Sequence, residues 1–231
     1  MREVLARTEI AEQRASIAVN DALASFRILH LPKGASDNEI SAAVARELPL
    51  DPERIVTRWV DLVSIVDRRV VYAAAWDRGH VRTITDAVRS VGIDPTVVEL
   101  RSAAVARAVS EPSCIVVDLC TDPAEIVLID GHVPQVWHSV RVNIPGSDPA
   151  ALLAPPLRTV LRFYRRRHVE FAAAAPVLIS AEQIFSAEQM AGLAHDLGQP
   201  VMVLPPPRRV PPEVRHPVYL ACLGLIMRRS G

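Results

Sequence analysis

Residues 114–142 read CIVVDLCTDPAEIVLIDGHVPQVWHSVRV, and their pattern gives the strongest indication of the fold class. Its apolar segments 114–119, 125–129 and 133–142 have the length and the β-branched content of strands. Asp130 and Gly131, between the second and third segments, form a strong hairpin signal. Because the connections are short, we expect neighbouring strands to run antiparallel. The stretch therefore predicts three antiparallel strands in succession.

Helix and strand patterns alternate after these strands. Apolar positions predict helices over 157–167, 187–197 and 218–229, and strands over 177–180 and 201–204. The proline-rich residues 145–156 are expected to form a connection, with the last prolines tolerated in the first turn of the next helix. The order β-β-β-α-β-α-β-α is that of the ribonuclease H-like fold, the building block of actin-like ATPases.

The first half of the chain mixes short strands with amphipathic helices. Strands are expected over 16–19, 26–31, within 55–65, over 70–75 and over 96–100, and helices over 2–14, 81–91 and 103–109. Ser36 and Glu39 form a capping-box signature for a further helix that Pro49 ends. The strand–helix–strand order from residue 70 onward predicts a right-handed parallel crossover between 70–75 and 96–100.

Composition narrows the classes of function. The chain has 231 residues with 26 basic and 26 acidic side chains, and this balance argues against wholesale nucleic-acid binding. Half of the residues are hydrophobic but only 4% are aromatic, so the core must rest on Ala, Val, Leu and Ile. The chain has 19 prolines and 9 glycines, and a glycine-poor chain is a poor candidate for a phosphate-binding loop. No apolar run is long enough to span a membrane.

Signatures of metal sites and of nucleophilic catalysis are weak. Cys114 and Cys120 stand at opposite ends of one expected strand, roughly 20 Å apart, which is too far for a shared metal. His132 and His138 have the same spacing and fail the same test. The three cysteines form no CxxC motif, and no GxSxG motif is present. We expect no metal site and a reducing compartment.

Two helices allow more than one interpretation. One carries a basic stripe of four arginines at helical spacing, Arg158, Arg162, Arg165 and Arg166. The stripe either contacts an acidic partner or anionic lipid, or it is a solvated face whose cations suit a helix C-terminus. The segment 218–227 is apolar nearly all round, which favours a buried last helix over an amphipathic membrane-targeting helix.

Several short stretches resemble PilM-like type IV pilus assembly proteins, which are relatives of the cell-division protein FtsA. They are Leu-Pro-Lys at 31–33, Glu-Leu-Pro-Leu at 47–50, Asp-Gly-His-Val-Pro at 130–134, Leu-Gly-Gln-Pro-Val at 197–201 and Ala-Cys-Leu-Gly-Leu at 221–225. Their order and spacing over nearly the whole chain carry the resemblance. It implies an α/β protein with mixed sheets and the ribonuclease H-like, actin-like ATPase fold in two lobes.

The resemblance also implies a division of the chain. Residues 1–68 correspond to the family's inserted 1C-type α+β subdomain with a short N-terminal remnant, 69–111 to a remnant of subdomain 1A, and 112–231 to the ribonuclease H-like subdomain 2A. The strand pair and first phosphate loop with which the family begins have no counterpart here. The first lobe is therefore expected to be incomplete, through N-terminal truncation, a misplaced gene start or decay of a longer gene.

By the same resemblance, 116–120 falls at the family's second phosphate motif and 177–183 at the start of its adenosine motif. The implied site positions are Asp118, Cys120, Thr121, Ser180, Ala181 and Glu182. Cys120 stands where the family has glycine, and Ala181 and Glu182 replace a glycine run, so bulk and negative charge occupy the nucleotide's place. Asp118 is the catalytic candidate only if the protein is an ATPase. Otherwise it is a strand-end aspartate that caps a turn with Thr121 or Asp122.

The resemblance implies a cytoplasmic scaffold or adaptor, peripheral at the inner face of the membrane, in the assembly platform of a type IV pilus or related secretion system. It would dock to the cytoplasmic peptide of an inner-membrane component, in a groove between the inserted subdomain and the 1A remnant, with self-association as a further option. The missing glycines predict no cofactor and no catalysis. The alternative is an enzyme, an actin-like ATPase or an FtsA-like membrane-associated polymerising protein, which would bind ATP and magnesium.

Overall fold

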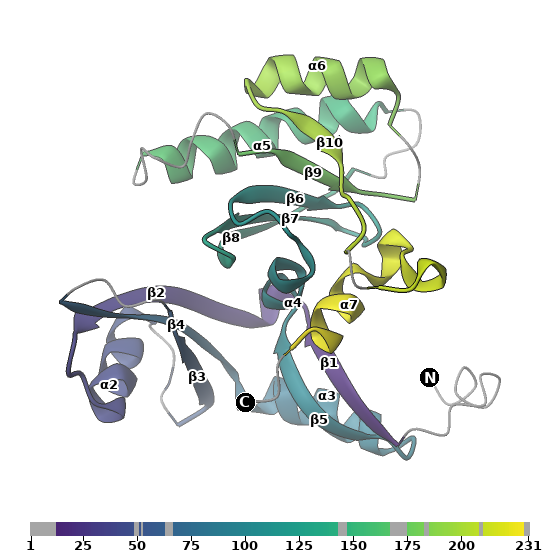
Figure 1. Ribbon diagram of the computed structural model, residues 1–231. Coiled ribbons are helices and arrows are strands. Elements are labelled where there is room, and N and C mark those ends of the chain that lie inside the picture. The colour runs from purple at the N-terminus through teal and green to yellow at the C-terminus, as the bar shows by residue number, and fades with distance from the viewer. Residues whose placement is uncertain are drawn as a thin grey trace. The chain divides into compact units, whose positions relative to one another are not determined.

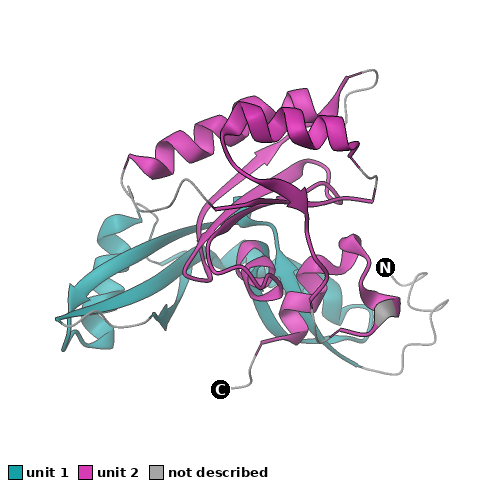
Figure 2. Ribbon diagram, turned by 45° about the horizontal axis from the view of Figure 1, so that its top comes forward, with its two compact units in different colours: residues 1–101 teal, residues 102–231 magenta. Residues whose placement is uncertain are grey.

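The structure is a computed structural model, and it describes residues 13–48, 51, 53–62, 67–142, 147–166, 175–182, 185–207 and 210–228. The chain forms two compact units, residues 1–101 and 102–231 (Figure 2). The family resemblance predicts subdomain boundaries after residues 68 and 111. The division into two units does not test these boundaries, so they stay predictions. The helix expected over 2–14 falls outside the described residues except at its end, where Arg14 already begins a strand.

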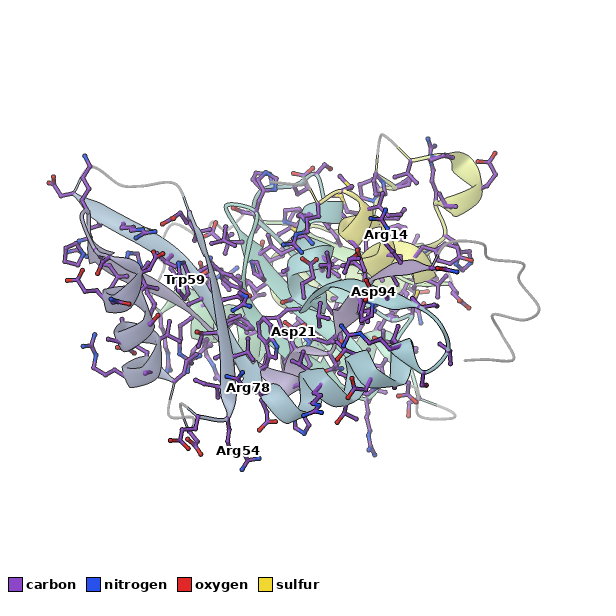
Figure 3. The ribbon with its side chains drawn as sticks, turned by 90° about the horizontal axis from the view of Figure 1, so that it is seen from below. Arg14, Asp21, Arg54, Trp59, Arg78 and Asp94 are labelled. Atoms are coloured by element: carbon purple, nitrogen blue, oxygen red, sulfur yellow. The ribbon has the colours of Figure 1, made fainter. Side chains whose placement is uncertain are left out.

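Three antiparallel strands and one helix form part of unit 1 (Figure 1). They are β2 (Ala24–Pro32), β4 (Arg68–Asp77), β3 (Ile55–Asp61) and α2 (Asp37–Glu47), with the sheet order β2-β4-β3. Ile40 and Val44 of α2 are fully buried in the shared core, and Trp59 of β3 packs against the same cluster (Figure 3). The expected capping box is confirmed, since Ser36 N donates to Glu39 Oε2 at 2.7 Å and Glu39 N donates to Ser36 Oγ.

A second pair of strands in unit 1 is parallel. β1 (Arg14–Val19) pairs with β5 (Asp94–Leu100), and α3 (Arg78–Arg89) connects β4 to β5. A 3-10 turn, η1 (Asp21–Leu23), joins β1 to β2. The expected parallel crossover between 70–75 and 96–100 is wrong, because these strands belong to different sheets. Both edges of β4 are occupied by β2 and β3, so β5 pairs with β1 instead.

Asp77 fixes the passage from β4 into α3. Its Oδ1 accepts hydrogen bonds from Gly79 N at 2.7 Å and from His80 N at 3.2 Å, so this carboxylate caps the helix. Arg54 reaches the same carboxylate at 3.2 Å, and Arg78 donates to a carbonyl of β3; Figure 3 shows both arginines. The hydrogen bond from His80 N is the main cause of the lowered pKa of Asp77.

Unit 2 contains a five-stranded mixed sheet with the order β10-β9-β6-β7-β8. Its strands are β6 (Cys114–Asp118), β7 (Ala124–Asp130), β8 (Val133–Val140), β9 (Val177–Ser180) and β10 (Val201–Val203). The first three are antiparallel, whereas β9 pairs in parallel with β6 and β10 pairs in parallel with β9. This arrangement confirms the ribonuclease H-like order expected from the sequence.

Helices flank the sheet of unit 2 on both of its sides (Figure 1). α5 (Pro149–Arg165) and α6 (Ala187–Leu197) cover one face, and α4 (Arg101–Ala108) and α7 (Leu220–Ile226) lie on the other side. The core under α5 and α6 is aliphatic, as the low aromatic content requires. Its fully buried members include Ile115, Ile126, Leu128, Leu153 and Leu157.

The hairpin between β7 and β8 closes with a two-residue turn. Gly131 and His132 both have left-handed backbone angles, with φ of 59° and 63°. Two such residues in succession give the turn geometry that matches the twist of antiparallel strands, which confirms the expected hairpin. Asp130 anchors the turn, because its carboxylate accepts hydrogen bonds from Ser113 Oγ at 2.6 Å and Tyr164 OH at 2.9 Å. Burial, and next the hydrogen bond that the Tyr164 hydroxyl donates to Asp130, raise the pKa of Tyr164.

α5 begins well before its expected start at residue 157. The connection expected over 145–156 is therefore wrong from residue 149 onward. Asp148 caps the helix, and Pro149 fits its first position because an N–H there has no acceptor within the helix. Pro155 and Pro156 lie inside the helix, where each removes one backbone hydrogen bond. Burial of the apolar stripe of α5 against the sheet offsets this loss.

The last helix is buried on one face only. The 3-10 turns η2 (Pro212–Val214) and η3 (Pro217–Tyr219) precede α7. Leu220, Leu223 and Gly224 are buried, whereas Ile226 is 79% exposed. The expectation of a buried helix therefore holds for one side of α7 and is wrong for the other. Among the described residues, no helix has the length and apolar character needed to cross a membrane.

Candidate functional site

The two motifs implied for nucleotide contact meet at one edge of the unit 2 sheet. β6 and β9 are parallel neighbours, and their last residues, Asp118 and Ser180, are aligned in register. The backbone N–H of Leu119 donates to the Ser180 carbonyl at 2.8 Å, so the two following loops start side by side. The fold therefore brings together residues that lie far apart in the sequence.

Asp118 is 1% exposed, and its carboxylate contacts its own turn. Its Oδ1 accepts a hydrogen bond from Cys120 N at 3.1 Å, and Thr121 Oγ1 donates to the Asp118 carbonyl at 3.3 Å. These contacts are typical of an aspartate that closes a turn after a strand. The turn-capping alternative accounts for this geometry, and a catalytic role for Asp118 stays a prediction.

Glu125 is a second buried carboxylate at this edge, and sequence reasoning missed it. It stands opposite Asp118 in the antiparallel register of β6 and β7 and is 1% exposed. Directly opposed residues project to the same face of a sheet, so the two acids and Ser180 share one face. The sequence did contain a signal for Glu125, because it directly precedes the apolar run 126–129. An acid in that position marks either the end of a strand or a rare buried carboxylate.

Cys120 distinguishes this site from a glycine-lined phosphate loop. Ser180 and the backbone of Glu182 lie close enough to the Cys120 thiol to affect its pKa, so the thiol lies near the loop that follows β9. Burial, and next the negative charge of Asp118, raise the pKa of the Cys120 thiol to about 11. Ala181 packs on the core beside them, and Glu182 is exposed and adds negative charge. Side chains and negative charge therefore occupy this turn.

Thiol reactivity tests this closed geometry. We expect iodoacetamide at mildly alkaline pH to modify the exposed Cys222 first. A pKa of about 11, against an ordinary value of 9.0, lowers the thiolate fraction of Cys120 roughly hundredfold, so its labelling should accelerate only as the pH approaches about 11. The buried Cys114, with its pKa raised to about 12, is the internal control. Peptide mass mapping across pH measures all three, and Cys120 labelling as fast as that of Cys222 would contradict this site geometry.

The described residues offer no metal centre, because no three histidine, cysteine, aspartate or glutamate side chains in that part of the chain are grouped to hold an ion. Cys114 begins β6, and Cys120 follows its end. His132 occupies the β7–β8 turn, and His138 lies within β8.

Unit 1 carries a concave surface for which sequence reasoning named no residue. It has a volume of about 180 Å³ and is lined by residues 27–31 of β2 and by Ala43, Arg46 and Glu47 of α2. β2 is an edge strand of the three-stranded sheet. Because successive strand residues point to opposite faces, a concavity lined by consecutive residues follows the edge of the strand. We call this surface the β2 groove.

Comparison with solved structures identifies the fold. The chain matches PilM of the PilM–PilN type IV pilus biogenesis complex with a TM-score of 0.70 and 18% identity, over 97% of this chain and 82% of that one. It matches the cytoplasmic domain of EpsL, an inner-membrane component of the type II secretion system of Vibrio cholerae, with a TM-score of 0.61 and 12% identity, over 99% and 80% of the two chains. A weaker match, to a Bacteroides thetaiotaomicron protein with an actin-like ATPase fold and unknown function, has a TM-score of 0.46 and 11% identity, over 87% and 74%. No family model and no curated protein matches the sequence.

The first two matches confirm the fold that the sequence resemblance implied. The chain has the mixed α/β, actin-like ATPase fold of PilM and of the EpsL cytoplasmic domain. At identities of 18% and 12%, this likeness concerns the fold alone.

Proposed function

We propose that this protein is a scaffold in the inner-membrane assembly platform of a type IV pilus or related secretion system, with binding rather than turnover as its output. One observation carries the proposal: over 97% of its length, the chain follows the fold of PilM from a PilM–PilN complex. The fold shared with the cytoplasmic domain of EpsL supports the same setting, because EpsL is an inner-membrane component. In this setting the protein works in the cytoplasm and reaches the membrane through its partner.

The partner in this proposal is the cytoplasmic peptide of an inner-membrane component, bound along the β2 groove. An extended peptide adds to an edge strand through backbone hydrogen bonds, while pockets beside the edge select its side chains. The β2 groove combines such an edge with a concavity against α2. Arg27 and Arg46 line it against one acid, Glu47, which favours acidic side chains in the peptide.

We also propose that nucleotide binding is lost, because the residues after β6 and β9 do not fit a magnesium nucleotide. Phosphate-binding loops present free backbone N–H groups, and glycine lets the phosphates approach them closely. Here Cys120 N already donates to Asp118, and the Cys120 side chain occupies the turn. Asp118 and Glu182 also place negative charge beside it, which would repel phosphates. We therefore assign no catalytic step to Asp118.

Peptide docking is tested by fluorescence anisotropy on the full chain. The probes are synthetic peptides with the sequences of the cytoplasmic tails of membrane proteins encoded beside this chain. We expect one tail to bind, and expect Arg27→Glu combined with Arg46→Glu to weaken its binding about tenfold or more. The matched control, Arg58→Glu with Arg141→Glu, changes the net charge equally at exposed residues that line neither this groove nor the other concave surface on the chain. Binding that is insensitive to the groove variant would refute the docking site, and failure of every tail to bind would refute the scaffold proposal.

Isothermal titration with Mg-ATP separates the scaffold from the ATPase alternative. We expect no measurable heat of binding to the wild-type chain, for the steric and electrostatic reasons given above. Circular dichroism on the same sample controls for folding. Micromolar binding that Asp118→Ala abolishes would overturn the loss of nucleotide binding and restore the actin-like ATPase interpretation.

A further inference from the structure

α5 carries a second concave surface, which we call the arginine pocket. It has a volume of about 350 Å³ and is lined by Arg158, Leu161, Arg162 and Arg165 of α5, by Arg166 directly after this helix, and by Leu197 of α6. α5 and α6 lie together over one face of the unit 2 sheet (Figure 1), and the pocket lies entirely within this unit. It shares no residue with the turn after β6 or with the β2 groove.

The positive charges of the pocket are concentrated and unusual. The four arginines occupy about 12 Å of helix, at spacings that place them on one face. Like charges at this spacing weaken a helix unless they are neutralised. Among the described residues, no carboxylate forms an ion pair or side-chain hydrogen bond with any of them. The structure therefore provides no internal counter-charge for this face within its described part.

The helix dipole does not explain all four arginines. α5 ends at Arg165, so Arg165 and Arg166 lie where the negative end of the dipole favours cations. Arg158 lies about two turns before that end, beyond the reach of this effect. The position of Arg158 in the stripe is therefore not explained by the helix dipole.

The floor of the pocket is apolar. Leu161 is 3% exposed and Leu197 is 6% exposed, and both line the pocket beside the arginines. A free inorganic anion would contact the arginines alone and make no use of the apolar floor. A membrane surface is broad and flat, whereas this site is a concavity between two helices. A peptide segment with both acidic and apolar side chains pairs with the arginines and contacts the apolar floor together.

We propose that the arginine pocket docks an acidic segment of a protein partner. Carboxylates of the segment pair with the arginine side chains, which form bidentate hydrogen bonds with carboxylates, and an apolar side chain lies over Leu161 and Leu197. Because the net charge of the whole chain is zero, the attraction is local to this face rather than a general property of the protein. This interaction surface is separate from the β2 groove and does not depend on the proposed function.

Fluorescence anisotropy on the full chain tests the pocket with a defined probe. The probe is a fluorescein-labelled peptide of the sequence EEALEELAEEALEE, titrated at low ionic strength. We expect Arg158→Glu combined with Arg162→Glu to weaken its binding at least about tenfold. The matched control reverses Arg68 and Arg141, two exposed arginines outside the pocket, and should leave the Kd within about twofold. A peptide with lysine at every glutamate position should not bind.

Two further measurements make the outcome decisive. Amide chemical-shift changes on the wild-type chain should map the acidic peptide to α5 and to the end of α6, which needs no substitution. Equal weakening by the pocket and control variants, or shifts confined to other elements, would overturn the proposal. Sedimentation with phosphatidylcholine vesicles that contain phosphatidylglycerol tests the lipid alternative. Binding to these vesicles through the same arginines, without binding of the peptide, would overturn it in favour of a membrane surface.

Discussion

We expect Gly224→Ala to destabilise unit 2 by about 3 kcal/mol or more, because α7 and α4 are in contact at this residue. A Cβ atom built at Gly224 would overlap the backbone carbonyl of Ala104 in α4. A carbonyl belongs to the helix backbone and cannot rotate aside as a side chain would. The Gly224 carbonyl also accepts a hydrogen bond from Arg107 Nε at 3.0 Å, so separating the helices would break that bond as well.

Gly192→Ala is the matched control for this substitution. Gly192 lies inside α6, is exposed, and has no atom within 4 Å of an added Cβ. Alanine is the better helix former, so this variant should be neutral or more stable by up to about 1 kcal/mol. Urea denaturation followed by circular dichroism measures both variants. Equal stabilities for the two variants would show that α4 and α7 do not pack as the structure has them.

The second large effect is expected at Leu157→Ala, with a loss of about 3 kcal/mol in the free energy of unfolding. Leu157 lies on the inner face of α5 and is fully buried in the core between this helix and the sheet. Alanine removes most of its apolar contacts and leaves a cavity in a region packed on several sides. Because α5 contains two internal prolines, its stability depends on this burial more than on its own hydrogen bonds.

Arg158→Ala, at the next residue of the same helix, is the control for Leu157→Ala. Its side chain is exposed, and we expect a change within about 0.5 kcal/mol. This pair of variants separates the two faces of α5 in one measurement of thermal or urea unfolding. A loss at Arg158 as large as that at Leu157 would mean that the arginine stripe stabilises the fold, and would weaken the case for a docking surface.

Local sequence signals predicted the secondary structure of unit 2 well. The Asp130–Gly131 signal marked the hairpin, and Gly198, with φ of 61°, ends α6 in the left-handed conformation typical of a helix cap. The same signals failed at α5, because two prolines at 155–156 suggested a helix start where the helix was already formed. A proline removes a backbone hydrogen bond from a helix, and this loss can be recognised in the sequence. The apolar burial that compensates for it becomes visible only when the whole helix is packed.

The candidate sites were less accessible to sequence reasoning. The resemblance named the positions after β6 and β9, and the parallel register places Asp118 beside Ser180. Glu125 was missed because its burial depends on which residue of a neighbouring strand lies opposite it. The lining of the β2 groove could not be named in advance, since it combines an edge strand with a helix whose packing angle no local motif specifies.

Four features follow from the sequence alone: the succession of strands and helices along unit 2, the capping box of α2, the basic stripe of α5 and the lack of glycines at the implied nucleotide motifs. These features depend on residue type and on spacing along one segment. Three other features emerge only when the segments pack: β4 pairs with β2 and β3, α7 leaves one side exposed, and the arginine stripe borders a pocket with Leu197 of α6. The physical reason is the same in each case. Strand pairing, burial and concavity depend on which surfaces of distant segments remain available, and that is settled only when the segments pack together.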